Sequence, residues 1–152
     1  MTETVKMQGF EALGRAFDQL PKATAANVGR RVLKKAGQPV YDHFHAIAPR
    51  GTEDQRHMAD SGGVSTKLIR RQRKKRNRSH DRDFAEMYIG PGRHVSAVQQ
   101  EFGNINHPAQ PSLTPAWEAN KRGVLNTINR ELWGEIKKAA DRLARKLARA
   151  RA

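Results

Sequence analysis

Hydrophobic residues near the start of the chain recur at the three- and four-residue steps of an α-helix. Phe10, Leu13, Phe17 and Leu20 follow this spacing. Pro21 comes directly after them, and its ring cannot continue the hydrogen-bond ladder behind it. The pattern therefore predicts a short helix that stops or changes direction at Pro21.

The segment Lys22–Ile47 carries a longer apolar stripe, with most of its charged residues off the stripe. This pattern predicts an amphipathic helix packed on a core. Gly37 and Pro39 interrupt it, so we expect a kink or two abutting helices rather than one straight helix. The stripe consists of Val28, Val32, Ala36, Val40, Phe44 and Ile47.

The clearest helical pattern covers residues 115–150, with Thr114 predicted as the N-cap and Pro115 as the first helical residue. Such a helix is roughly 50 Å long, which exceeds what a compact domain of this size can cover. We therefore expect its basic last turns to project outward or to pack on another subunit. Its apolar stripe consists of Leu125, Ile128, Leu132, Ile136, Ala139, Leu143 and Leu147.

Strand-forming residues lie between the two long helices. Residues 64–70 alternate between apolar and polar, and residues 84–89 end sharply at a Gly-Pro-Gly turn. Together with the region around Val5, they predict a small antiparallel sheet. The expected fold class is α+β, in a single domain spanning residues 1–152. The small antiparallel sheet packs against two long amphipathic helices, and a basic β-hairpin arm or loop joins the later two strands.

That basic arm spans residues 67–82 and holds nine cations against one acid, Asp81. Like-charge repulsion and low hydrophobicity favour an exposed hairpin arm or loop. Such an arm binds the phosphates of nucleic acid or docks on an acidic protein, and the composition leaves both open. The residues expected to make this contact are Arg70, Arg71, Arg73, Lys74, Lys75, Arg76 and Arg78.

The overall composition narrows the classes of partner and chemistry. Lys and Arg total 29 against 15 Asp and Glu, a net charge of +14, so polyanions or acidic protein surfaces are the expected partners. The absence of Cys excludes disulfides, thiolate catalysis and Cys-ligated metal sites. No apolar run approaches the ~18 residues of a membrane span or forms a signal peptide, so we expect a cytoplasmic protein or particle component, with no membrane partner.

Residues that could carry catalysis are not grouped at diagnostic spacings. His43 and His45 are two positions apart, which on a helix directs them to different faces. Paired acids such as Glu53 and Asp54 could in principle hold Mg²⁺, but beside so many arginines they are better interpreted as salt-bridge partners. We expect no catalytic, cofactor-binding or metal-binding residues, and no enzymatic function.

Trp117 and Trp133 lie sixteen positions apart on the predicted C-terminal helix, on faces about 160° apart. The same partner cannot readily bury both. We therefore expect one of them to lie at a subunit interface, where Trp is enriched.

Several short motifs, spread over nearly the whole chain, occur together in one known family. They are residues 5–13 (VKMQGFEAL), 20–21 (LP), 48–49 (AP), 89–92 (IGPG), 100–103 (QEFG) and 108–116 (PAQPSLTPA). With these motifs the chain resembles the small neck, or head–tail joining, proteins of long-tailed siphophages, in the lambdoid type usually described as a minor tail component. Members usually carry an aromatic residue where this chain has Ser112, and a shorter segment after Ala-Pro.

The resemblance implies a structural virion protein without cofactors, assembled in the host cytoplasm. Copies form a ring, expected to be hexameric, in the neck between head-completion and tail-tube proteins, around a channel that carries genomic double-stranded DNA. Residues 101–103 and 108–115 are then fixed-shape elements that place the C-terminal helix. The expected oligomer or neck interface consists of Glu101, Phe102, Gly103, Pro108, Pro111, Pro115, Trp117 and Trp133.

The predicted function is therefore tail completion, or a tail-terminator-like role, in the phage neck. The alternative is a sequence-nonspecific double-stranded-DNA-binding protein, and a metal-dependent nuclease is a third hypothesis. The residues leave open which neck ring the chain forms, and whether the basic arm contacts DNA or protein.

Overall fold

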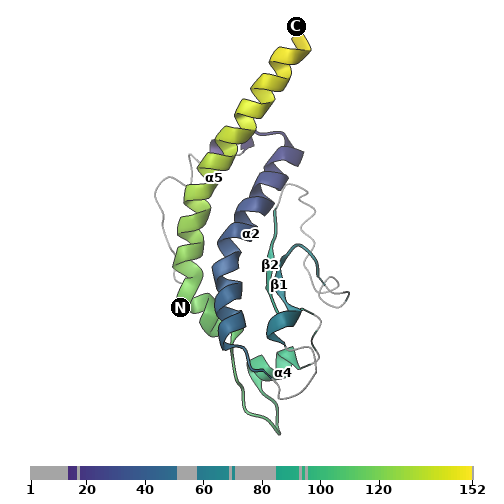
Figure 1. Ribbon diagram of the computed structural model, residues 1–152, viewed down its shortest axis with the longest axis vertical. Coiled ribbons are helices and arrows are strands. Elements are labelled where there is room, and N and C mark those ends of the chain that lie inside the picture. Colours follow the sequence, from purple (N-terminus) through teal and green to yellow (C-terminus); the bar gives the residue numbers. More distant parts are fainter. Residues whose placement is uncertain are drawn as a thin grey trace.

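The structure is a computed structural model that describes residues 14–16, 18–50, 58–68, 70, 85–92, 94 and 96–151. Two long helices, α2 (Lys22–Ile47) and α5 (Leu113–Arg151), run side by side (Figure 1). Strands β1 (Gly63–Ser65) and β2 (Tyr88–Gly90) form an antiparallel sheet that packs on α2. The short helices η1 (Ala59–Ser61) and α4 (Ala97–Phe102) flank the sheet in sequence. The expected α+β fold, with a small antiparallel sheet against long helices, is confirmed.

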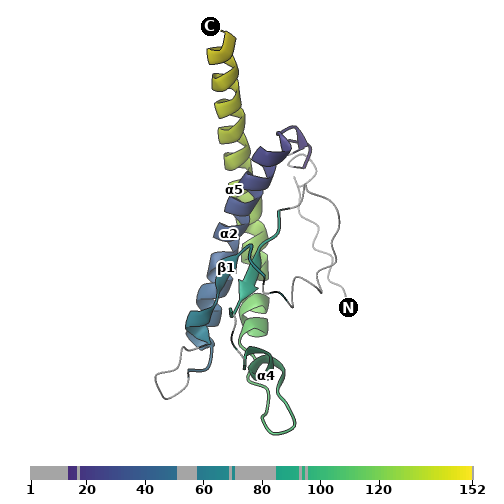
Figure 2. The ribbon, with the colours of Figure 1, turned by 90° about the vertical axis from the view of Figure 1, so that its right-hand side faces the viewer.

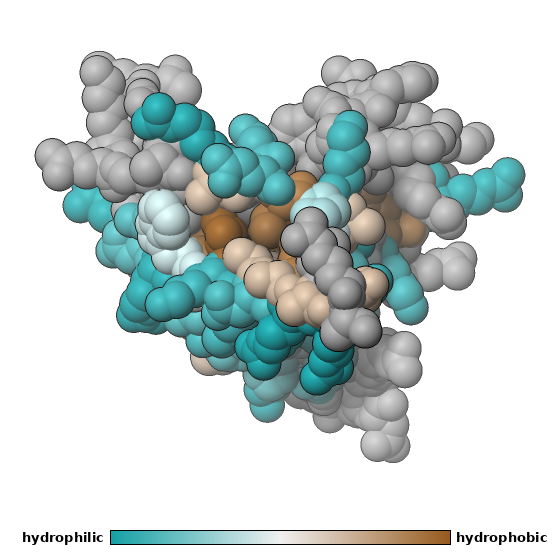
Figure 3. Space-filling view, turned by 90° about the horizontal axis from the view of Figure 1, so that it is seen from above, coloured by the Kyte–Doolittle hydropathy of each residue, from teal (hydrophilic) through white to brown (hydrophobic). Residues whose placement is uncertain are grey.

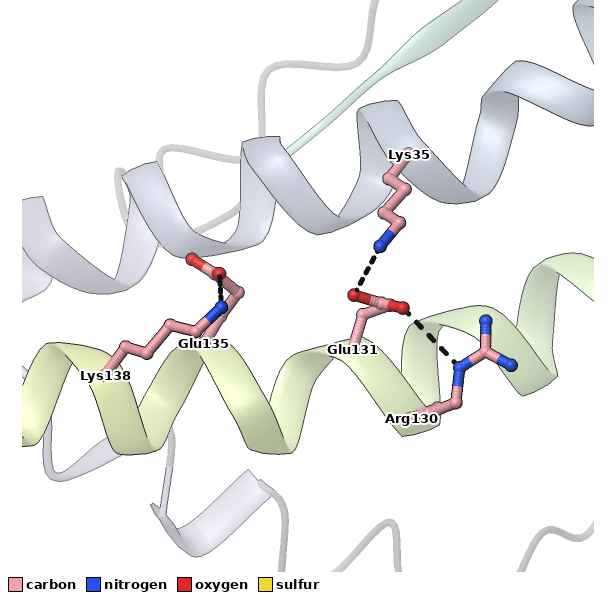
Figure 4. A network of polar contacts seen from close by, with 5 residues as sticks. All are labelled: Lys35, Arg130, Glu131, Glu135 and Lys138. Atoms are coloured by element: carbon pink, nitrogen blue, oxygen red, sulfur yellow. Dashed lines mark hydrogen bonds and ion pairs between the residues drawn. The ribbon is translucent and has the colours of Figure 1, made fainter.

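Ion pairs between the two long helices show their relative direction. Arg31 Nη2 lies 2.7 Å from Glu135 Oε2, and Lys35 Nζ lies 2.8 Å from Glu131 Oε2. Later residues of α2 therefore meet earlier residues of α5, and the helices are antiparallel. Figure 4 shows Lys35 reaching across from α2 to Glu131.

Buried apolar side chains of α2 and α5, together with a few from neighbouring residues, form two clusters. Val28 and Phe44 of α2 are fully buried, and each contributes about 1.5–3 kcal/mol by leaving water. The first cluster contains Ala36, Val40, Phe44, Ala48, Met58, Ala59, Ala116 and Val124. The second contains Leu20, Ala25, Val28, Ile136 and Ala139. The predicted helical stripes therefore supply most of the core that the described residues form. Ile47 is the exception: it lies at the end of α2 and is exposed, so its prediction as a core residue is wrong.

The sheet packs closely on α2 at Gly37. Val64 of β1 and Ile89 of β2 are cross-strand partners. A Cβ atom at Gly37 would lie 2.9 Å from Ile89 Cδ1 and 3.2 Å from Val64 Cγ1. Glycine is therefore present because it lets the Val64–Ile89 pair approach the helix backbone.

The helix α2 continues without a break through Pro39, so the alternative of two abutting helices is wrong. An internal proline costs a helix about 3 kcal/mol. Pro39 itself is exposed, while Ala36 and Val40 beside it are buried against α5 and the sheet region. Burial on both sides of Pro39 holds the helix together despite the lost hydrogen bond.

Some other helix and strand boundaries differ from those predicted, and some predicted segments lie outside the described residues. Among the described residues, the strands pair over Gly63–Ser65 and Tyr88–Gly90, so residues 66–68 and 85–87 of the predicted strands are not paired, and each strand includes one glycine outside its predicted range. Residues 14–16 and 18 are helical before Pro21, as expected. The predicted strand around Val5, and most of the basic arm, lie outside the described residues.

The helix α5 begins two residues earlier than predicted, at Leu113. Its 39 residues make it about 58 Å long. Its C-terminal turns extend well past the start of α2, as Figures 1 and 2 show from two sides. The expectation that these turns project outward is therefore confirmed for the isolated chain.

Candidate functional site

The carboxylate of Glu101 binds the beginning of α5 from the neighbouring helix α4. The N–H groups of Ser112 and Leu113 donate to Oε2 at 2.9 and 3.0 Å. The N–H and the hydroxyl of Thr114 donate to Oε1 at 2.8 and 2.6 Å. A negative charge here meets both the unpaired N–H groups and the positive end of the helix dipole. Glu101 is thus the cap of α5 and fixes α4 against its first turn.

Burial raises the pKa of Glu101, but the hydrogen bonds from the Thr114 hydroxyl and the backbone N–H groups of residues 112–114 outweigh it. The net result is that the pKa of this carboxyl is lowered. All these donors favour the ionised form. Glu101 therefore carries its negative charge at neutral pH.

Ser112 takes the position before the first helical residue, where serine usually accepts a hydrogen bond two or three residues on. Here Thr114 donates its N–H to Glu101 instead, and Pro115 has no N–H. Ser112 is 1% exposed, and its Oγ has no hydrogen-bond partner in the described chain. The prediction of Thr114 as N-cap is wrong, because Thr114 is helical and its hydroxyl binds Glu101 rather than its own helix.

The segment of residues 103–112, which we call the connecting segment, joins α4 to α5 and folds back on itself. Gly103 has a φ of 72°, which favours glycine, and a Cβ there would lie 2.8 Å from Ala109 N. The Gly103 N–H donates to Gln99 O, and the Gln110 N–H donates to Gln100 O, both at 2.7 Å. Because both acceptors belong to α4, the two ends of the connecting segment are held to the backbone of that helix.

Large apolar side chains on α4 and the connecting segment face solvent. Phe102 is 76% exposed and Ile105 is 98% exposed, and Val98 is exposed as well. Trp117 and Trp133 of α5 are each 45% exposed. Such side chains, held on a braced segment, are typical of surfaces that a partner covers.

The predicted interface residues are only partly brought together. Those from Glu101 to Trp117 follow one another through α4, the connecting segment and the first turns of α5. Pro108, Pro111 and Pro115 are exposed there. Trp133 is about 24 Å further along α5, so it belongs to a different part of the surface.

A second region lies at the C-terminal end of α5. Exposed cations line an open groove of about 270 Å³ between their side chains; they are Arg142, Arg145, Lys146 and Arg149. Figure 3 shows the molecule from above, the end at which the last turns of α5 project; most of the coloured side chains in this view are hydrophilic, with a smaller group of hydrophobic ones between them. Sequence reasoning noted the basic last turns but did not assign these residues to a site.

Two acids of α5, Glu131 and Glu135, form ion pairs with cations in the middle of the helix pair. Figure 4 shows Glu131 with Lys35 and Arg130, and Glu135 with Lys138. The hydrogen bond from Lys35 lowers the pKa of Glu131. Burial raises the pKa of Glu135, but Lys138 and Arg31 outweigh it and leave the pKa lowered. Both carboxylates are therefore ionised at neutral pH and already paired with cations of the same protein.

Of the residues predicted to contact a polyanion or an acidic partner, Arg70 is described and exposed. The others lie outside the described residues, and so do Glu53 and Asp54; they are Arg71, Arg73, Lys74, Lys75, Arg76 and Arg78.

The described histidines make local contacts. His43 Nδ1 lies 3.0 Å from Asn120 Nδ2 of α5, and His45 Nε2 lies 2.7 Å from Asp60 Oδ1. The two therefore point to different neighbours, as their spacing predicts. Within the described ranges, no group of three or more His, Asp or Glu side chains could hold a metal ion. None of the described helices is both long and apolar enough to cross a membrane.

Comparisons with models of protein families, with curated proteins and with solved structures found no match to this chain.

Proposed function

We propose that this protein is a structural subunit of the neck of a long-tailed bacteriophage. Copies assemble into a ring, expected to be hexameric, between head-completion proteins and the tail tube. The role is tail completion, or a related ring of the neck, and the subunit has no catalytic task. The channel of the ring carries double-stranded DNA.

The observation that carries this proposal is the exposure of Phe102, at the end of α4, and of Ile105, on the connecting segment that follows it. Exposing large apolar side chains to water costs free energy that a neighbouring subunit recovers by covering them. Because Glu101 and Gly103 already hold the segment in shape, little conformational entropy is lost when it docks. This is the behaviour expected of a subunit whose surface is completed by copies of itself.

The length of α5 is a second support. Its last turns extend past the body of the chain (Figure 2), so in a ring they could reach a neighbouring subunit or the channel. The sequence motifs that resemble the neck family include residues 100–103 and 108–116, which together form the capped start of α5.

The test is the oligomeric state of the full chain, measured by mass photometry over a range of concentrations. We expect a defined oligomer for the wild type, and a shift toward monomer for the double variant Phe102→Ser with Ile105→Ser. The matched control is Ile47→Ser, which removes a hydrophobic side chain exposed at 43% on another element. A wild type that stays monomeric even with neck and tail proteins present contradicts the proposal, as does a double variant that assembles normally.

The alternative function is a free, sequence-nonspecific double-stranded-DNA-binding protein. The net charge of +14 favours it. It predicts a monomer that binds DNA, with affinity lost when Arg71, Arg73, Lys74, Lys75 and Arg76 are replaced by Ala. The oligomeric state distinguishes the two functions, since a defined oligomer is expected for the neck subunit and a monomer for the free DNA-binding protein.

A further inference from the structure

The C-terminal turns of α5 form a free-standing rod. Leu143 is partly buried and still packs against the cluster of Leu20, Ala25 and Val28. Beyond it, residues 144–146 and 148–150 are all exposed. Figures 1 and 2 show no described element beside this end of the helix. A partner can therefore approach the rod from several sides.

Four cations gather on one face of this rod. Arg142, Arg145, Lys146 and Arg149 are spaced i, i+3, i+4 and i+7, which places them within about 100° of arc. They span about 10 Å along the axis. On the same helical wheel, Ile136, Ala139 and Leu143 point to a different side, toward α2. The basic face, defined by these four residues, is thus separate from the face that packs on the body of the protein.

None of these four side chains forms an ion pair with the described part of the chain. Arg145 Nε donates only to the backbone oxygen of Asp141, at 3.3 Å. In the middle of the helix pair, by contrast, side-chain nitrogens of Arg31, Lys35 and Lys138 each lie within 3.2 Å of a carboxylate oxygen. After Asp141 the sequence contains no acid at all. The pairing that neutralises the middle of the helices is therefore missing at this end.

The helix dipole explains cations only in the last turn. Arg142 and Arg145 lie more than one turn before the end of α5, so a stabilising role in the helix does not account for them. The basic face also contains no aromatic or large apolar residue, whereas the centre of a protein–protein interface is rich in aromatics and poor in charge. Binding to phosphate groups requires only cations on the protein, since each Arg or Lys neutralises one phosphate.

We propose that the basic face at the end of α5 binds the phosphate backbone of double-stranded DNA without reading its sequence. A single helix with its side chains is about 10–12 Å across, close to the width of the major groove of B-DNA, about 12 Å. The free-standing rod can therefore lie along or in the groove with its cations facing phosphates. This site is distinct from the connecting segment and from the predicted basic arm, and it does not depend on ring assembly.

The test measures binding of the full chain to fluorescein-labelled 30-base-pair duplexes of two unrelated sequences, by anisotropy at several salt concentrations. The site variant replaces Arg142, Arg145, Lys146 and Arg149 by Ala. The matched control replaces three exposed arginines and one exposed lysine elsewhere, Arg15, Arg30, Arg50 and Lys34, by Ala. Both variants keep the predicted basic arm and have the same net charge.

We expect equal binding of the two duplexes by the wild type. The site variant should bind at least tenfold more weakly at 0.1 M salt. Its slope of log affinity against log salt should be less steep by about 3.6, since each of the four phosphate contacts contributes about 0.9. The affinity of the control variant for the duplex should fall by less than threefold. Equal losses in the two variants would overturn the proposal, because net charge alone would then explain binding.

Two further measurements keep the result interpretable. Circular dichroism of the site variant should show unchanged helix content, because Ala is the best helix former and the replaced side chains are exposed. Polyglutamate at equal charge concentration should displace the labelled duplex far less well than unlabelled duplex. If polyglutamate competes as well as DNA, the basic face is a site for acidic protein and the proposal is wrong.

Discussion

Glu101 binds N–H groups that belong to a different helix, so its contribution to stability is a tertiary one. Its carboxylate accepts four hydrogen bonds from residues 112–114. Hydrogen bonds to a charged group are each worth more than those between neutral groups, and a missing cap costs a helix about 1 kcal/mol. The side chain thus ties α4, the connecting segment and α5 together.

Replacing Glu101 by Gln is expected to lower the free energy of unfolding by about 1–3 kcal/mol, because an amide nitrogen would face donors in place of an acceptor. Urea denaturation of the full chain measures this. The control is Glu118→Gln, since Glu118 is exposed and pairs with Lys121 on the same helix. Equal effects of the two substitutions would contradict the capping role.

The same residue makes stability depend on pH. The pKa of Glu101 is lowered in the folded protein, below the unfolded value of about 4.3. Its contribution is therefore fully present above that unfolded value and is lost as the pH falls through the lower folded pKa. The difference in unfolding free energy between wild type and Glu101→Gln should be constant from pH 7 to 6 and shrink toward pH 3. A constant difference down to pH 3 would show that the charge is unimportant.

At the scale of elements, the contact between the sheet and α2 depends on a missing side chain. In an exposed helix interior, Gly→Ala stabilises by about 0.5–1 kcal/mol. At Gly37 the added methyl would lie 2.9–3.3 Å from atoms of Ile89 and Val64. Crowding of this kind costs about 1–3 kcal/mol.

We therefore expect Gly37→Ala to be destabilising by about 1 kcal/mol. Gly123→Ala, in α5, has nothing within 4 Å of the new Cβ and should be stabilising by about 0.5–1 kcal/mol. Both values come from urea denaturation under the same conditions. If Gly37→Ala raised the free energy of unfolding as much as Gly123→Ala does, the sheet would not pack on α2 as described.

At the scale of the whole molecule, the charges are unevenly compensated. Acids on α5 pair with cations of α2 in the middle of the helix pair, while the end of α5 and the predicted arm carry surplus positive charge. Exposed ion pairs are worth at most about 1 kcal/mol each. With a net charge of +14, self-repulsion of the folded chain is the larger effect.

Added salt is therefore expected to stabilise the protein. The melting temperature should rise between 0.02 and about 0.5 M NaCl, as the Debye length falls from over 20 Å to below 5 Å. Choline chloride at the same ionic strength serves as the control for specific ion binding and should give the same rise. A falling melting temperature would mean that the ion pairs outweigh the repulsion.

The pattern of amino acids alone predicts the two long helices and most of their apolar stripes, because helical periodicity is a local property. Val28, Val40, Phe44 and Ile136 were recognisable as core residues from spacing alone. The projection of α5 beyond the rest of the protein also follows from the length of its helical pattern.

Features that depend on a partner distant in the sequence become visible only in the folded chain. Strand ends depend on which residues find a neighbour to pair with, and the passage of α2 through Pro39 depends on packing around it. Glu101 is eleven to thirteen residues from the groups it caps, so no local pattern signals its role, although Pro115 and the lack of an acid in the first turn of α5 are a hint. The role of Gly37 required knowing that Val64 and Ile89 lie against it.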